Sequence, residues 1–299
     1  MSDLADEAVP GDGAPGPESV AWRYVGDWRL LFGVGRALVL QVAHPVVGAG
    51  VTQHSDLRSD PWRRFNHTLE SLMIQVYGGE AATSEARRLR DRHRSINGVD
   101  GRGRQYRALG PEAYWWVHAT IFESVLADHD RFGRALSAAD QVRFYKEWKA
   151  LGRLLGVPGS QIPPDLAAFW SYYEGMLTDR LEDNQAVRDV LDAITGHGTP
   201  PPPGWRAPAA AWWPVSSTLG KVMYRVTVGM LPPALRRRLD LAWTASDERG
   251  LSALGAVVRT AFPALPPRWR YHPVAADTIR RGWPGRSPQR PRATGTVAM

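Results

Sequence analysis

Helical periodicity is the sequence feature that most limits what this chain can fold into. Apolar residues recur at three- and four-residue intervals through most of the chain, whereas runs of alternating β-branched residues are few. Proline and glycine divide this pattern into helices of ordinary length, as in the segment that Pro61 opens and Gly78 closes. The sequence therefore predicts an all-α fold: a single large helical bundle-like domain with a small C-terminal helical lobe.

The helix signals also predict where the domain begins and ends. We expect the helical domain over residues 19–275, after a disordered leader (1–18) and before a disordered tail (276–299), because both ends are rich in Pro and Gly. The helices are expected over residues 19–42 (with a break at His44-Pro45), 61–77, 83–96, 111–132, 138–155, 165–181, 184–194, 215–228, 232–239 and 246–261. Residues 97–110 are predicted to form a loop and residues 195–209 a Pro-rich linker.

Composition excludes several classes of protein. The chain has no cysteine, which excludes disulfides, iron–sulfur clusters and a cysteine nucleophile. Its net charge of +7 is spread along the chain and forms no basic stripe with interleaved aromatics, so we expect no nucleic-acid partner. The most apolar run, residues 30–51, is interrupted by polar residues and proline, which argues against an integral membrane segment. The N-terminus has no apolar secretory core, so we predict a cytoplasmic protein.

The predicted helix over residues 61–77 carries an unusual polar face. Arg64, His67 and Thr68 lie three and four residues apart, so they share one side of the helix. An arginine is well suited to bind a carboxylate, and an imidazole can bind a metal. This face is interpreted either as a solvated surface or as the lining of a ligand site.

His118 is the most informative single histidine. It belongs to an apolar stripe with Tyr114, Phe122 and Val125 in the predicted helix over residues 111–132. A buried imidazole there either hydrogen-bonds to a neighbour in the core or projects into an apolar pocket, as the axial ligand of a haem does.

Several segments together resemble one known family. They are "HPVVGAGVTQHSDLRSDPWRRFNHTL" (44–69), "WVHATIFES" (116–124), "LGVP" (155–158), "LPPALRRRLDLAWTASDERGL" (231–251) and "RYHP" (270–273). In order and spacing the chain resembles the MpaB/latex-clearing protein (rubber oxygenase) family of haem b oxygenases. The resemblance implies an all-helical fold, a haem b cofactor and dioxygen as co-substrate.

The resemblance also implies roles for individual residues. His118, followed by alanine within a helix, matches the axial ligand of the haem iron, and Arg64 with Thr68 matches the Arg/Thr pair of the haem pocket. His67 stands where the rubber oxygenase has a lysine that can ligate the iron on its distal side. The implied site thus has His118 on the iron, Arg64 and Thr68 at the haem, and Arg64 and His67 as catalytic residues.

Two departures from the family pattern weaken the transfer of the reaction. The rubber oxygenase has a proposed acid–base glutamate upstream of the Arg/Thr helix, but this chain has no glutamate between residues 18 and 70. His44, His54 and Asp56 are the nearest substitutes, and the sequence does not choose among them. Glu123 occupies the place of a second histidine. We therefore expect this chain to share the family's haem pocket more closely than the rubber oxygenase's substrate.

The sequence thus predicts a haem-dependent oxygenase that acts on a small, mainly apolar molecule, with oxidative cleavage of a C=C bond as one outcome. Its alternative is a non-catalytic helical protein that binds haem or an apolar ligand on the same scaffold. A third hypothesis is peripheral membrane binding through residues 226–239, whose arginines at 236–238 could meet anionic lipid. The sequence does not indicate partner proteins.

Overall fold

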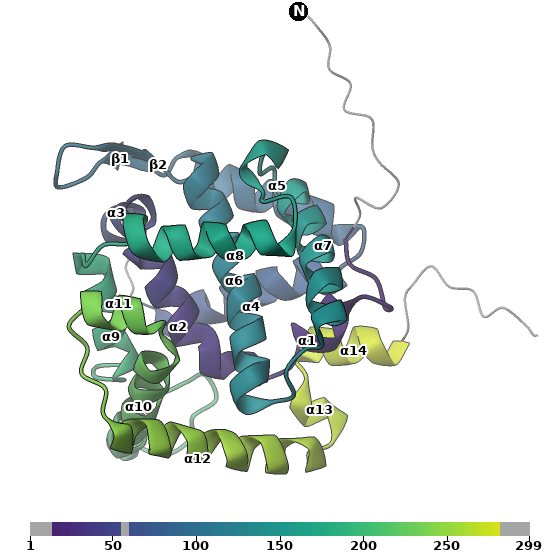
Figure 1. Cartoon of the computed structure of the whole chain (residues 1–299). Helices are drawn as coiled ribbons and strands as arrows, with labels where there is room; N and C mark the ends of the chain where they lie inside the picture. The colour runs from purple at the N-terminus through teal and green to yellow at the C-terminus, as the bar shows by residue number, and fades with distance from the viewer. Residues whose placement is uncertain (1–13, 55–59, 282–299) are drawn as a thin grey trace, which may run out of the picture.

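The predicted all-α fold is confirmed in the computed structural model, which describes residues 14–54 and 60–281. Helices account for nearly all of the regular structure in this part of the chain (Figure 1). The elements are α1 (Val20–Tyr24), α2 (Leu30–Ala43), α3 (Pro45–His54), α4 (Pro61–Tyr77), α5 (Ala81–Arg94), β1 (Asn97–Val99), β2 (Gln105–Arg107), α6 (Pro111–Phe132), α7 (Ala138–Leu154), η1 (Gly159–Gln161), α8 (Leu166–Gly175), the π-turn η2 (Met176–Arg180), α9 (Gln185–Ile194), α10 (Ala209–Met230), α11 (Pro233–Arg238), α12 (Ala245–Ala261), η3 (Phe262–Ala264), α13 (Pro267–Arg270) and α14 (Pro273–Arg281).

Helix α2 organises the packing, because it contacts α6, α9, α10 and α3. Glycines let its neighbours approach closely. A Cβ at Gly33 would overlap the carboxylate of Asp128 on α6, and one at Gly35 would overlap the hydroxyl of Thr227 on α10. Larger side chains at these two positions would push α6 and α10 away from α2.

The main hydrophobic core extends from α1 to α14 and is rich in aromatic rings. Trp115, Trp116, Phe122, Phe144 and Trp148 are all fully buried, and they pack α6 against α7 and α8. Rings of this size dominate core energetics because each removes a large apolar area from water. A second, smaller cluster of buried residues, where α12 packs on α6 and α10, consists of Phe132, Val226 and Leu251.

Two predicted boundaries differ from the structure in the first half of the chain. The helix expected over residues 19–42 is divided into α1 and α2, because Asp27 pairs with Tyr271 in an isolated bridge and Trp28 N–H donates to the Arg270 carbonyl. The predicted loop over residues 97–110 contains the hairpin β1–β2, whose register pairs Gly98 with Tyr106.

Two further differences lie toward the C-terminus. Helix α10 begins at Ala209 and continues through Pro214, so it is longer than the predicted helix over residues 215–228. The tail was expected to be disordered from residue 276, but α14 continues to Arg281. The reason is tertiary packing: α14 lies against α4, and Ala275 is fully buried. Residues 1–13 of the leader and 282–299 of the tail lie outside the described residues.

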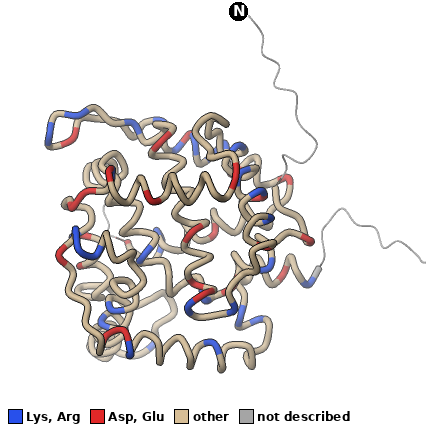
Figure 2. The backbone as a smooth tube through the Cα atoms, viewed as in Figure 1, with Lys and Arg blue, Asp and Glu red and all other residues tan. Residues whose placement is uncertain are grey.

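Charged residues of both signs are interspersed over the described chain (Figure 2). Within this part of the chain, no helix alone is long and apolar enough to cross a membrane. Helices α2 and α3 would suffice together by length and composition, but they meet at a bend of 101°.

Candidate functional site

Helix α4 presents Arg64, His67 and Thr68 together on one exposed face, here called the α4 face. The helix begins where the Asp60 carboxylate accepts a hydrogen bond from the Arg63 N–H (3.1 Å), with Pro61 in the first turn. Its opposite side is anchored by buried apolar residues: Leu69, Met73 and Val76. The sequence grouped these three polar residues correctly, because helical spacing alone determines a shared face.

The three side chains of the α4 face differ in what they still offer a ligand. The Thr68 hydroxyl donates to the Arg64 carbonyl (3.0 Å), so its hydrogen is already used within the helix. Desolvation by nearby protein atoms lowers the pKa of Arg64, although its side chain is accessible to solvent. His67 has no hydrogen-bond partner among the described residues.

His118, in contrast, lies on α6, where its ring is buried against α7 and hydrogen-bonded to Trp148. The imidazole Nε2 lies 2.9 Å from the Trp148 carbonyl oxygen, and Trp148 Nε1 donates to the His118 carbonyl at the same distance. The two rings are stacked, with centroids 4.6 Å apart and an interplanar angle of 15°. Burial lowers the pKa of His118 to about 4, although the Trp148 carbonyl opposes the shift. The neutral ring therefore joins α6 to α7 through these contacts with Trp148, here called the clamp.

The contacts of His118 leave one ring nitrogen for a metal. Nε2 carries the hydrogen that it donates to the Trp148 carbonyl, so the lone pair of the neutral ring is on Nδ1, which has no described hydrogen-bond partner. The role of His118 as an iron ligand therefore stays a prediction. The edge of the ring that contains Nε2 packs against α7, because a Cβ at Gly152 would come within 3.4 Å of His118 Cδ2. Within the described chain, no hydrogen bond or ring contact joins His118 to the α4 face. The α4 face, with a cation and an imidazole that has no partner among the described residues, also fits the polar edge and the iron of a haem.

Two of the three candidate substitutes for the missing glutamate can be placed. His44 is buried, its Nδ1 accepts from the Val46 N–H, and its Nε2 lies 3.2 Å from Glu112 Oε1. Burial lowers the pKa of His44. His54 is exposed and its Nε2 lies 3.1 Å from the Tyr106 hydroxyl. Asp56 lies outside the described residues.

Glu112 is a candidate acid–base group that sequence reasoning missed. It follows Pro111 in the first turn of α6, where it meets His44 and the guanidinium of Arg180. Partial burial raises its pKa, but hydrogen bonds from Arg180 and His44 outweigh that effect and hold the pKa of Glu112 below its usual value. In the sequence, an acidic residue just after a helix-opening proline is explained by its favourable interaction with the helix dipole. Its contact with His44 arises only in the folded chain.

Glu123, which stands in place of the family's second histidine, is also engaged. It forms a buried ion pair with Arg36 of α2, and Arg36 in addition donates to the Met230 carbonyl (2.6 Å) and lies 3.3 Å from the Tyr173 hydroxyl. This network joins α2, α6, α8 and the end of α10. Its position in the core indicates a structural role for Glu123.

Comparison with known proteins determines the family. The family described as "ER-bound oxygenase mpaB/B'/Rubber oxygenase, catalytic domain" matches residues 22–260 of the chain. The protein belongs to this family.

The curated relatives of this MpaB/rubber oxygenase family member carry no described function. An uncharacterized protein of Mycobacterium bovis and one of Mycobacterium tuberculosis are each 27% identical over 236 residues, which covers 77% of this chain and 88% of each relative. No solved structure matches the chain. The family supports an oxygenase-type function, and the contacts above indicate which residues are still available for it.

Proposed function

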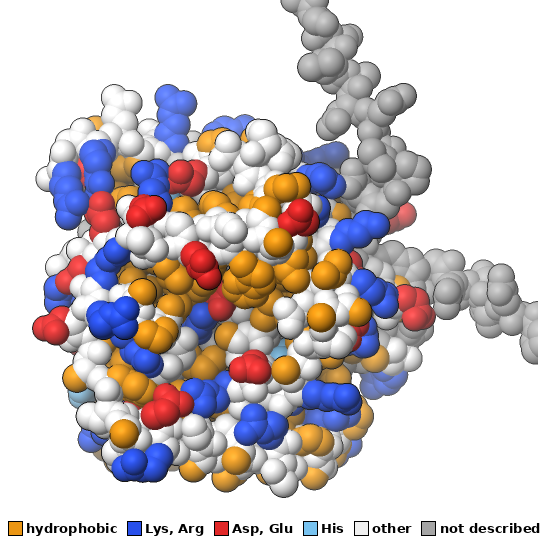
Figure 3. Space-filling model, viewed as in Figure 1, with side chains coloured by type: hydrophobic (Ala, Val, Ile, Leu, Met, Phe, Trp, Pro, Cys, Tyr) orange, Lys and Arg blue, Asp and Glu red, His pale blue; other side chains and the backbone are white. Residues whose placement is uncertain are grey.

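We propose that this chain is a haem b oxygenase of a small, mainly apolar molecule, with the haem held at the α4 face. Membership of the MpaB/rubber oxygenase family over residues 22–260 is the observation that carries the proposal. Haem, when bound, supplies the activation of dioxygen. Hydrophobic side chains gather in a hollow on the face of the molecule below α8 (Figure 3), which supports an apolar substrate.

Each residue of the α4 face has a role in this proposal. Arg64 donates to a haem propionate, which its fork of N–H groups suits. His67 contacts the iron, because it is the imidazole among the predicted site residues that has no other described partner. Thr68 keeps only its oxygen lone pairs for the site, since its hydrogen is bonded to the Arg64 carbonyl. His118 holds α6 to α7 through Nε2, and its Nδ1 would bind the iron.

Absorption spectra of the purified protein test this proposal. Wild type supplied with haem during expression should contain one haem per chain, and His67→Ala should lose it or show an altered spectrum. His93→Ala is the matched control, because His93 is bonded within α5 to the Leu89 carbonyl. A colourless wild-type product would end the haem proposal, and an unchanged spectrum in His67→Ala would remove His67 from the iron.

A second candidate function is a non-catalytic carrier of haem or of an apolar ligand. It is favoured because Glu123, which stands in place of the family's second histidine, is held in a buried ion pair with Arg36. Turnover separates the two candidates. Reduced, haem-loaded protein mixed with oxygen and candidate alkenes should give oxidised products, detected by mass spectrometry, only if the protein is an oxygenase.

A further inference from the structure

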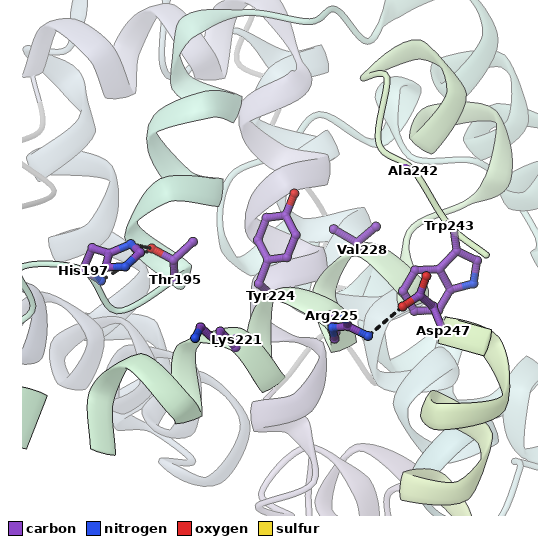
Figure 4. A pocket seen from close by; sticks show the side chains of 9 residues that line it. All are labelled: Thr195, His197, Lys221, Tyr224, Arg225, Val228, Ala242, Trp243 and Asp247. Atoms are coloured by element: carbon purple, nitrogen blue, oxygen red, sulfur yellow. Dashed lines mark hydrogen bonds and ion pairs between the residues drawn. The ribbon is translucent and has the colours of Figure 1, made fainter. Parts of the chain in front are cut away.

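A pocket of about 390 Å³ lies on a different part of the molecule from the α4 face. Figure 4 shows it between the turn after α9, the second half of α10 and the start of α12. Three of its residues, Lys221, Tyr224 and Arg225, lie on one face of α10. The rest of the lining is Thr195, His197, Val228, Ala242, Trp243 and Asp247.

The charges of this pocket do not cancel. Arg225 is paired with Asp247 (2.7 Å), the one carboxylate in the lining. Asp247 also accepts hydrogen bonds from Thr244 Oγ1 (2.7 Å) and the Thr244 N–H (3.0 Å), and these bonds lower its pKa. Lys221 has no ion-pair or hydrogen-bond partner among the described residues. The pocket therefore contains one cation that its own carboxylate does not neutralise.

His197 adds a second polar group with a defined orientation. The Thr195 hydroxyl donates its only hydrogen to the Asp192 carbonyl (2.6 Å), so it can only accept from His197 Nδ1, which lies 2.8 Å away. The proton of the neutral ring is therefore on Nδ1, and Nε2 is left for a ligand. With this tautomer Nε2 has the lone pair, so it accepts a hydrogen bond from a ligand.

The remaining lining of the pocket is apolar. Val228 is buried, and Tyr224 and Trp243 present their rings. The indole N–H of Trp243 is already bonded to Glu248 Oε2 (3.0 Å), so Trp243 offers the pocket only apolar ring atoms. The site thus has a cationic end and an apolar wall.

We propose that this pocket binds an amphiphilic acid, with its anionic head at Lys221 and its apolar body against Tyr224, Val228 and Trp243. The volume is at the small end of the range for ligand sites, about 300–1,000 Å³. The head can belong to a free acid or to a membrane lipid, because a neighbouring face of α10 is an exposed apolar groove lined by Pro214, Val215, Thr218, Leu219 and Val222. This site is independent of the proposed oxygenase function.

Calorimetric titration of the full chain, without added haem, tests whether the pocket recognises the anionic head of the ligand. Octanoate should bind more tightly than 1-octanol, which has the same chain length without the charge. Lys221→Glu should weaken octanoate binding about fivefold or more, the upper range for a partly exposed ion pair. The matched control is Lys146→Glu, because Lys146 is an exposed lysine on α7 outside the pocket, and this variant should bind as wild type does.

Sedimentation with lipid vesicles distinguishes the two sources of the acid. Binding to phosphatidylglycerol vesicles but not to phosphatidylcholine vesicles, lost in Lys221→Glu, would assign the pocket to a lipid headgroup. Binding of octanoate without vesicle binding would assign it to a free acid. The proposal is overturned if neither octanoate nor phosphatidylglycerol vesicles bind, or if octanol binds as tightly as octanoate. It is also overturned if Lys221→Glu binds octanoate and phosphatidylglycerol vesicles as wild type does.

Discussion

Replacing His118 with alanine tests whether this residue helps to hold the fold together. The variant loses the hydrogen bond to the Trp148 carbonyl, worth about 1 kcal/mol, since that carbonyl keeps its own helical partner. It also loses a stacked ring pair worth about 1 kcal/mol, and the space left by a buried ring costs about 1 kcal/mol more. We expect the free energy of unfolding of the haem-free protein to fall by about 3 kcal/mol at pH 7.

The same variant should respond differently to pH. His118 has a folded-state pKa of about 4, below the unfolded value of about 6.5. Between these values only the unfolded chain takes up the proton, so wild-type stability is complete above pH 6.5 and falls as the pH drops toward 4. Wild type loses roughly 2 kcal/mol from this residue between pH 6.5 and pH 5, and the variant does not. The difference between the two proteins should therefore shrink to about 1 kcal/mol at pH 5.

Urea unfolding of haem-free protein at pH 7 and pH 5, followed by circular dichroism, measures both effects. His67→Ala is the control, because His67 is exposed on α4 and its loss should change stability by less than about 0.5 kcal/mol. A haem-free His118→Ala protein as stable as wild type would refute the clamp.

Three further predictions concern the core and are checked by urea or thermal unfolding. Gly220→Ala should destabilise the protein by more than about 1 kcal/mol, because the new Cβ would overlap a backbone carbonyl at the end of α9. Gly175→Ala is the control: Gly175 has open space around it, so this variant should be neutral or stabilise by up to about 1 kcal/mol. Burial raises the pKa of Asp128, whose carboxyl oxygens have no described partner. Asp128→Asn should therefore gain stability over wild type as the pH rises above about 4, and equal pH profiles of the unfolding free energy would contradict this. Arg36→Met should cost about 3–5 kcal/mol by leaving Glu123 unpaired in the core, and adding Glu123→Gln should recover part of the loss.

The sequence predicted most of the helices because their signals are local. The spacing of apolar residues, the Asp60 cap and the prolines that open α4 and α6 act within a few residues. The errors arose where distant segments determine the backbone. The hairpin β1–β2 packs on α3: Tyr106 is buried, and its hydroxyl donates to Gln53 Oε1 of α3. Helix α14 depends on packing against α4, which composition does not reveal.

The candidate site shows the same division between local and distant information. The shared face of Arg64, His67 and Thr68 follows from helical spacing, and the structure retains it. The apolar stripe around His118 indicated a buried ring but not its partner, since Trp148 lies 30 residues away on another helix. Likewise, nothing local connects His44 with Glu112, which come together only when α2 and α6 pack.

The face of α6 on which His118 lies bears directly on the cofactor. His118 and Phe122 are one turn apart, and both rings contact Trp148 of α7. Val117 and Ile121 occupy the neighbouring side of α6 and are only partly buried, so a ligand that approaches this side meets aliphatic side chains. A flat apolar cofactor could pack there without disturbing the clamp. His118 keeps Nδ1, and His67 keeps its whole ring, without a described partner. The spectra of His67→Ala and His118→Ala together therefore decide which imidazole binds the iron.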